Sequence, residues 1–249
     1  MTTVAVLADP PREGLVGAQL AETTPLSTAE AAGLYTAMLR DVCRAVEASG
    51  GDLLVNYRAD EDLPDAADGD AEAEVREAVA PALEDPESAR YEVQVGSSFA
   101  ARAGNTVTHL LEEEGVETAA VVEPTAPFLA RQVVDNAAMK LRRSDVVLGP
   151  ATDGRVFYAG FAEPVDFEDA FAAPEVETLT DRAADAGLDV DFLEMHPVVE
   201  TAADLAETLA LLTARVRADR IRPAHTAEFL LESGLTVTAG PEGLRLARE

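Results

Sequence analysis

The sequence predicts an α/β fold in which a mostly parallel central sheet is flanked by helices. Apolar runs of strand length alternate with segments of helical periodicity along most of the chain. The chain opens with a strand, a long loop, a helix and a second strand, and such a βαβ unit implies a parallel pair of strands. With 249 residues, of which 47% are hydrophobic, the chain is long enough to bury a full core.

The opening βαβ unit carries clear start and stop signals. An apolar run over Thr3–Ala8 predicts a buried strand, and a long loop follows it. Ser27 and Glu30 then have the spacing of a capping box, which predicts the start of a helix. Apolar residues recur at helical spacing until Gly50, where the helix is expected to end. The next predicted strand is Asp52–Tyr57.

The rest of the chain continues the alternation. Further strands are predicted over 91–95, 118–122, 145–148, 156–161 and 189–194, and helices over 71–83, 98–114, 127–141, 176–186 and 205–216. The acidic stretch 60–87 is expected to be a solvated outer element. After a short helix over 224–231, a hairpin of strands 235–239 and 244–247 is expected around the turn 240–243. We therefore predict one domain over 1–222 and a small C-terminal appendix, of one helix and the hairpin, over 223–249.

Charge is the most unusual property of the composition. Asp and Glu total 47 against 19 Lys and Arg, which gives a formal net charge of −28. Such a charge destabilises the compact state by self-repulsion at low ionic strength, whereas at 1 M salt the Debye length falls to about 3 Å. Because the acids are spread along the whole chain, the composition predicts a protein adapted to concentrated salt. The alternative is an acidic protein without such an adaptation.

Composition also excludes several classes of function. Nucleic-acid binding needs a basic stripe, and the basic runs here, 140–143 and 215–222, stand where helices are expected to end. The single cysteine, Cys43, excludes a disulfide framework and is expected to be a buried thiol. We recognise no signal peptide and no apolar stretch of the roughly 18–20 residues that a membrane span needs. A cytoplasmic protein that binds neither nucleic acid nor membrane is expected; the oligomeric state is left open.

One segment carries a specific motif. Residues Ser144–Phe161 read SDVVLGPATDGRVFYAGF, which describes a buried strand, a turn at Asp153-Gly154 and a returning strand with aromatic residues. This segment resembles the signature of a glycosyltransferase-like family associated with arsenosugar biosynthesis, and more distantly the 2-phospho-lactate guanylyltransferases. The family pattern is Asp-Val-Val-Leu-Gly-Pro-Ala, any residue, Asp-Gly-Gly, two aromatics and Gly-Leu. Here Arg155 replaces the last glycine of Asp-Gly-Gly.

Weaker landmarks follow in the family's order, so that the resemblance covers about residues 4–215. They are the loop 11–20, the pair Leu34-Tyr35, the strand end 121–127 and the segment 198–205. The resemblance implies a glycosyltransferase A type fold, similar to nucleotide-diphospho-sugar transferases, and a nucleotide-activated sugar or another small molecule as ligand.

The resemblance also implies a set of site residues. A diphosphate needs cations, supplied by arginine, by backbone N–H groups or by a divalent metal such as Mg²⁺ or Mn²⁺. Catalytic roles fall to Asp153, which would orient the acceptor, and to Glu123, which would also hold the metal. Nucleotide-binding residues are Arg12, Gly14, Gly17 and Gln19; substrate-binding residues are Gly154, Arg155, His196 and Glu200.

Three positions that handle charge depart from the family pattern. The first loop has Gly17, Ala18 and Gln19 where the family has Lys and Arg, so Arg12 is its only cation. Glu123 stands where the family has an aspartate, and Val198 replaces the first aspartate of the last motif. Two functions are therefore predicted as alternatives. One is a transferase that uses a nucleotide-activated donor, and the other is a non-catalytic binding or scaffold protein that keeps the fold.

Overall fold

The structure, a computed structural model, describes residues 1–64, 69–241 and 243–248. Its strands are β1 (Thr2–Ala8), β2 (Asp52–Tyr57), β3 (Arg90–Val93), β4 (Thr118–Val122), β5 (Val146–Pro150), β6 (Val156–Phe161), β7 (Val190–Phe192), β8 (Leu235–Gly240) and β9 (Gly243–Arg248). Its α-helices are α1 (Ala18–Thr23), α2 (Thr28–Glu47), α3 (Ala71–Val79), α4 (Phe99–Thr108), α5 (Arg131–Lys140), α6 (Glu175–Asp185), α7 (Ala202–Arg217) and α8 (Ala224–Glu232). Short helical turns lie at Asp60–Asp62, Ala80–Ala82, His109–Glu113 and Thr152–Gly154.

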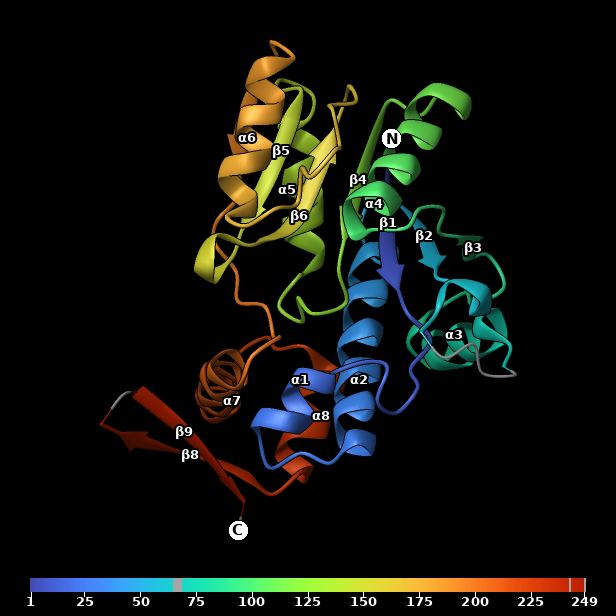
Figure 1. Ribbon diagram of the computed structural model, residues 1–249. Helices are drawn as coiled ribbons and strands as arrows, with labels where there is room; N and C mark the ends of the chain where they lie inside the picture. Colours follow the sequence, from blue (N-terminus) through green and yellow to red (C-terminus); the bar gives the residue numbers. More distant parts are fainter. Residues whose placement is uncertain (65–68, 242, 249) are drawn as a thin grey trace.

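Seven strands form one sheet in the order β3-β2-β1-β4-β6-β5-β7 (Figure 1). All neighbouring pairs are parallel except the two that involve β6, which runs against β4 and β5. The reversal follows from the short turn between β5 and β6, because a connection of that length permits only an antiparallel pair. The prediction of a mostly parallel sheet flanked by helices is therefore confirmed.

Helices cover both faces of the sheet. On one face α2, α3 and α5 pack against β1 and β4 around Val6, Leu39 and Val122. On the other face α4 and α6 pack around Ala5, Val107 and Leu179. The central strand β1 is buried along its whole length, as expected for a strand with helices on both sides.

A third apolar cluster joins α2 to the C-terminal part of the chain. Leu34 of α2 packs with Leu205 and Leu212 of α7 and with Leu230 of α8. The buried Asp41 of α2 also accepts hydrogen bonds from the first N–H groups of α8. Figure 1 shows α7, α8 and the β8–β9 hairpin gathered beside α1 and α2, below the sheet. The division of the chain at residue 222 stays a prediction.

Several local predictions are confirmed. Ser27 caps α2 and exchanges hydrogen bonds with Glu30 in a complete capping box. The helix predicted to start near residue 98 is present as α4, and Ser98 caps it by accepting a hydrogen bond from the N–H of Ala101. Cys43 is a buried free thiol, and burial raises its pKa. Within the described residues, no helix combines the length and the apolar composition needed to cross a bilayer.

Other local predictions need correction. Helix α1 lies in what was expected to be a loop, and it begins at Gly17, whose left-handed backbone (φ 65°) favours glycine. The acidic stretch 60–87 is not merely a solvated element, because Val75 and Val79 of α3 are fully buried in the core. Residues 65–68 of that stretch, and residue 242 of the predicted turn 240–243, lie outside the described residues.

Candidate functional site at the carboxyl edge of the sheet

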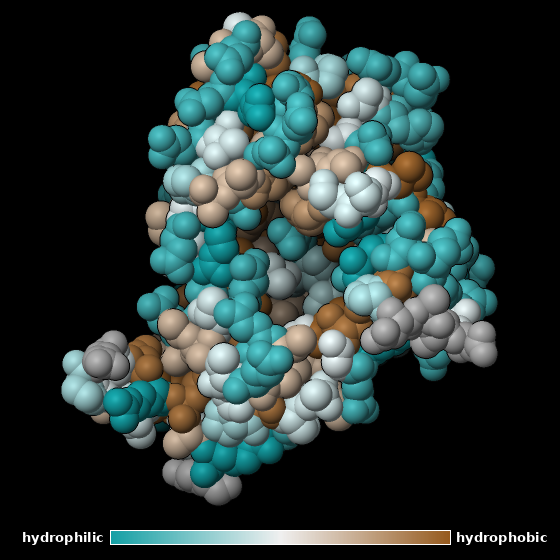
Figure 2. All heavy atoms as spheres, viewed as in Figure 1, coloured by the Kyte–Doolittle hydropathy of each residue, from teal (hydrophilic) through white to brown (hydrophobic). Residues whose placement is uncertain are grey.

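The loops that follow the parallel strands meet at one edge of the sheet. Val6 of β1 lies beside Val122 of β4, and Val122 lies beside Tyr158 of the antiparallel β6. The residues after β1 and β4 therefore lie next to the residues before β6. Figure 2 shows a hollow in the middle of the visible face, at the level where the β1 arrow ends in Figure 1. Open α/β sheets bind ligands at this edge.

Glu123 is the first residue after β4 and lies half-buried at this edge. In the described part of the chain, no group donates a hydrogen bond to its carboxylate, and no cationic side chain lies within 4 Å of it. Burial, and then the negative charges of Glu200, Glu175 and Asp9, raise its pKa from 4.5 to about 8. The site thus holds an acid that is protonated near neutral pH and that a cation would ionise.

Arg155, which immediately precedes β6, is enclosed by acids. Its Nη1 lies 2.9 Å from Glu200, and its Nη1 and Nη2 lie 2.9 and 2.8 Å from the two oxygens of Asp204. It also donates to the carbonyl oxygen and the hydroxyl of Thr152. Only 14% of the Arg155 side chain is exposed. The guanidinium therefore orients Glu200 toward the edge rather than offering a free cation to a phosphate.

Asp204 anchors this network. Its side chain is 6% exposed, and it forms the capping box of α7 with Thr201. Burial favours the neutral acid, but hydrogen bonds from Arg155 and from the N–H of Thr201 lower the pKa of Asp204 overall. A buried carboxylate held in this way keeps its charge, and it fixes the position of Arg155. The role of Asp204 was missed from the sequence, although its place three residues after Thr201 is the spacing of a capping box.

Asp153 lies at the rim of this cluster. Its side chain is 84% exposed, and its carboxylate is 3.7 Å from Arg155. Asp153 and Gly154 both have a left-handed backbone, with φ of 58° and 73°. The turn predicted at Asp153-Gly154 is thus present, and its glycine takes a conformation that glycine adopts without strain. Nearby, Glu175 at the start of α6 accepts a hydrogen bond of 2.8 Å from the N–H of Val156.

Two arginines that were not predicted from the sequence lie at the ends of β1 and β2. Arg58 directly follows β2, and its guanidinium pairs with Asp9, which directly follows β1. Arg102 lies in the first turn of α4 and donates to Gln94 over 2.7 Å. Their positions, directly after a predicted strand and at the start of a predicted helix, were the available signal.

The loop after β1 places its predicted residues apart from this cluster. Arg12 is bound by the carboxylates of Asp60 and Glu74, and Gln19 is exposed on α1. Gly14 and Gly17 both have positive φ. The nucleotide-binding roles of these four residues stay predictions.

His196 and Val198 follow β7. The His196 ring packs edge-on against Phe157, with ring centres 5.2 Å apart, and burial, then Arg215, lower its pKa. The side chain of Val198 belongs to the buried core. The aspartate expected at this position is thus replaced by a packing residue, and the acid two positions later, Glu200, faces the site.

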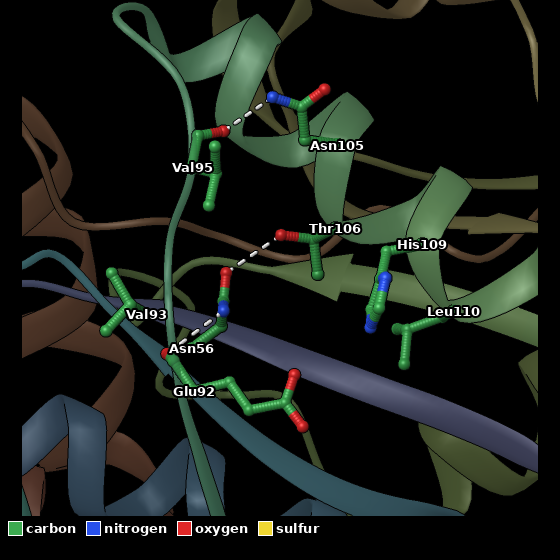
Figure 3. A pocket seen from close by; sticks show the side chains of 8 residues that line it. All are labelled: Asn56, Glu92, Val93, Val95, Asn105, Thr106, His109 and Leu110. Carbon is green, nitrogen blue, oxygen red and sulfur yellow. Dashed lines mark hydrogen bonds between the residues drawn. The ribbon is translucent and has the colours of Figure 1, made fainter. Parts of the chain in front are cut away.

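A separate pocket of about 320 Å³ lies between β3 and α4 at the edge of the sheet. Figure 3 shows that its hydroxyl and amide side chains are already hydrogen-bonded, Thr106 to Asn56 and Asn105 to the carbonyl of Val95. Glu92, His109 and Glu114 bring possible metal ligands within 4.8 Å of one another beside it. Arg90 already binds both of these carboxylates, however. The lining of this pocket includes neither Glu123 nor Glu200, and it offers a ligand few free polar groups.

Comparison with known proteins supports the fold. A family model described as uncharacterised proteins conserved in bacteria (DUF2064) matches residues 55–173. A crystal structure from Desulfovibrio desulfuricans G20, provisionally assigned as a nucleotide-diphospho-sugar transferase, is 20% identical, covers 93% of this chain and 94% of its own, and gives a TM-score of 0.76. No curated protein sequence matches the chain.

Two nucleotide-using enzymes share the fold more distantly. A CMP:2-keto-3-deoxy-manno-octonic acid synthetase in complex with CTP is 12% identical, with 86% and 99% coverage and a TM-score of 0.50. A cytidylyltransferase from Leptospira borgpetersenii serovar Hardjo-bovis is 8% identical, with 93% and 94% coverage and a TM-score of 0.50. The chain therefore has an α/β fold that matches the structures of nucleotide-diphospho-sugar transferases.

Proposed function

We propose that the chain is a transferase that binds a nucleotide-activated sugar, or a related nucleotide, at the carboxyl edge of the sheet. The observation that carries the proposal is the unpaired carboxylate of Glu123, which lies among like charges at the strand end where this fold binds ligands. An acid held in this state is a functional-site candidate, because a structural carboxylate would be paired. The CTP complex of a protein with the same fold supports a nucleotide as ligand.

A divalent metal, Mg²⁺ or Mn²⁺, fits the donor set of this edge. Mg²⁺ is commonly held by one or two carboxylates together with substrate phosphates. Glu123 has no other partner among the described residues, and Glu200 is close enough for its charge to raise the pKa of Glu123. These two glutamates would hold the metal, which would neutralise charge on the diphosphate when bound.

The remaining predicted residues fall on two sides of this position. Asp153, exposed at the rim, would orient the acceptor, and Gly154, Arg155 and His196 would line the substrate side. Arg12, Gly14, Gly17 and Gln19 would border the nucleotide, mainly through the backbone of the loop after β1. The match of the 145–154 motif supports a relation to the glycosyltransferase-like family associated with arsenosugar biosynthesis.

The second candidate function is a binding or scaffold protein without catalysis. It is favoured by the state of the two predicted cations, because Arg12 and Arg155 are each occupied by two carboxylates of the chain. A protein of this kind would bind a small molecule at the same edge without needing a metal.

Nucleotide binding with and without metal separates the two functions. We expect calorimetry in high salt to detect binding of a nucleoside diphosphate in the presence of Mn²⁺, and a Glu123→Gln variant to lose the metal dependence. Glu112→Gln, which changes an exposed glutamate on the turn after α4, is the matched control and should bind as the unmodified protein does. Binding that is equal with and without metal, in both variants, would rule out the transferase and favour the scaffold.

A further inference from the structure

Arg58 and Arg102 lie at one point of the carboxyl edge, beside the end of β1. The backbone N–H of Arg58 donates to the carbonyl of Ala8 over 3.1 Å. The same carbonyl accepts 3.1 Å from Nε2 of Gln94, whose Oε1 accepts from Arg102. Both arginines are therefore tied to the last residue of β1, one directly and one through Gln94.

Gln94 makes this arrangement rigid. It is 3% exposed, and its Nε2 also donates to the carbonyl of Asn56 over 2.7 Å. Both donors of its amide are thereby used on β1 and β2, so that its oxygen is presented to Arg102. A guanidinium held by a buried amide at its Nε keeps its two terminal nitrogens directed away from that amide. The polar groups of this corner thus form a built site rather than a chance cluster on the surface.

The two cations are paired with only one acid. Arg58 has Asp9 as a partner, with 3.1 Å between Nη2 and Oδ2. Its buried Nε has no hydrogen bond, although it lies 3.0 Å from Oδ1. Arg102 has no carboxylate within 4 Å in the part of the chain that the structure describes, and its terminal nitrogens donate no hydrogen bond there. Arg40 and Arg215 are also half-buried without an acid within 4 Å among the described residues, but their side chains donate to backbone carbonyl groups, whereas Arg102 donates only to the side chain of Gln94.

Opposite charges act on Arg102 at this corner. Burial, and then the neighbouring charge of Arg58, lower the pKa of Arg102, whereas the charges of Asp9, Asp62 and Glu123 act in the opposite direction. The carboxyl group of Asp9 is also half-buried, and burial raises its pKa even though Arg58 and Arg102 oppose the rise. An anion that approached this corner would meet two guanidinium groups and would compete with the carboxylate of Asp9, whose two oxygens lie 3.0 and 3.1 Å from Arg58.

We propose that Arg58 and Arg102 form a binding site for a phosphate or diphosphate group, with Asp9 occupying part of it in competition with the ligand. Planar guanidinium groups offer paired donors that match phosphate oxygens. This site would bind the phosphate groups that the family resemblance assigned to cations of the loop 11–20. Only the identity of the ligand as a nucleotide diphosphate rests on the proposed function. Arg58 follows β2 and Glu123 follows β4, and these two strands lie on either side of β1, so one nucleotide could span both positions.

Titration of inorganic pyrophosphate by calorimetry tests this site without any nucleotide. We expect Arg102→Gln and Arg58→Gln each to weaken binding by roughly 10- to 100-fold, the loss of a charge-assisted hydrogen bond. Asp9→Asn should strengthen binding several-fold, because it removes the competing charge and keeps the shape of the side chain. Arg142→Gln, which changes an exposed arginine beyond α5, should leave the affinity unchanged.

The opposite sign of the Asp9 variant separates a site from a merely structural ion pair, since damage to the fold would weaken binding in all three variants. Affinity that is unchanged in Arg102→Gln, or weaker in Asp9→Asn, would overturn the proposal. So would equal affinity for sulfate and pyrophosphate, or no pyrophosphate binding to the unmodified protein. If pyrophosphate responds to these variants while Glu123→Gln has no effect on nucleotide binding with metal, the anion site stands and the transferase proposal fails. The reverse pattern would reject this site alone.

Discussion

Replacing Glu123 by glutamine should stabilise the protein at alkaline pH. The carboxylate lies half-buried among three other acids, and these surroundings raise its pKa from 4.5 to about 8. Glutamine has the same shape and no charge to be repelled. The substitution therefore removes an unfavourable ionisation and little else, because the carboxylate has no hydrogen-bond donor among the described residues to lose.

The direction of the effect follows from proton linkage. Between pH 4.5 and about 8 the folded protein holds a proton on Glu123 that the unfolded chain releases, so stability falls as the pH rises through this window. A tenfold change in the acid dissociation constant corresponds to about 1.4 kcal/mol. The raised pKa of Glu123 therefore limits the gain in unfolding free energy of the glutamine variant to about 5 kcal/mol. Contact of the half-buried carboxylate with water lowers the expected gain to about 2 kcal/mol above pH 8. Below pH 4.5 the variant and the unmodified protein should have the same stability.

Urea unfolding followed by circular dichroism measures this difference. The two proteins should be compared at pH 4, 6, 7 and 9 in roughly 1 M KCl. At this ionic strength the Debye length is about 3 Å, so that interactions with distant surface charges are screened. The control Glu112→Gln should give a difference that does not depend on pH. A constant difference between Glu123→Gln and the unmodified protein from pH 4 to 9 would refute the raised pKa and the crowding of acids that it reports.

Three further predictions follow from the charges of the structure. Asp204→Ala should lower the free energy of unfolding in urea by about 3 kcal/mol, because it leaves the 14%-exposed Arg155 without its bidentate partner and removes the capping box of α7. A loss below about 0.5 kcal/mol, which is usual for a surface substitution, would contradict the importance of this network. Asp153→Asn should change stability by less than about 0.5 kcal/mol, because the side chain is 84% exposed and Asn tolerates a φ of 58°, whereas lower ligand affinity in this variant would mark Asp153 as a site residue. With a net charge of −28, thermal unfolding should shift to a higher temperature between about 0.1 M and about 3 M KCl; equal midpoints would reject adaptation to salt.

The centre of the sheet can be predicted from the sequence because strands β1, β4, β5 and β6 are almost entirely buried. The apolar runs of β1, β2 and β4 and the signature around Asp153-Gly154 stand out without any tertiary information. The same holds for the capping box at Ser27, which is local. Helix α1 was missed because Leu20 is its single buried side chain, which leaves no apolar periodicity to detect.

The partners of the charged residues were beyond the reach of the sequence. Arg155 binds Asp204, which is 49 residues away, and Arg12 binds Glu74, which is 62 residues away. Only the folded chain shows that these cations are already neutralised. Conversely, Arg102 has no carboxylate within 4 Å among the described residues. No pattern in a sequence so rich in acids predicts which arginine will lack an acidic partner.

The most direct test of the site is a crystal structure of the protein soaked with a nucleoside diphosphate and Mn²⁺ in high salt. We predict an anomalous manganese signal between Glu123 and Glu200, and the diphosphate at the carboxyl edge facing Arg58 and Arg102. A nucleotide bound instead in the pocket between β3 and α4, or manganese held at Glu92, His109 and Glu114 with the carboxyl edge empty, would contradict the proposed site.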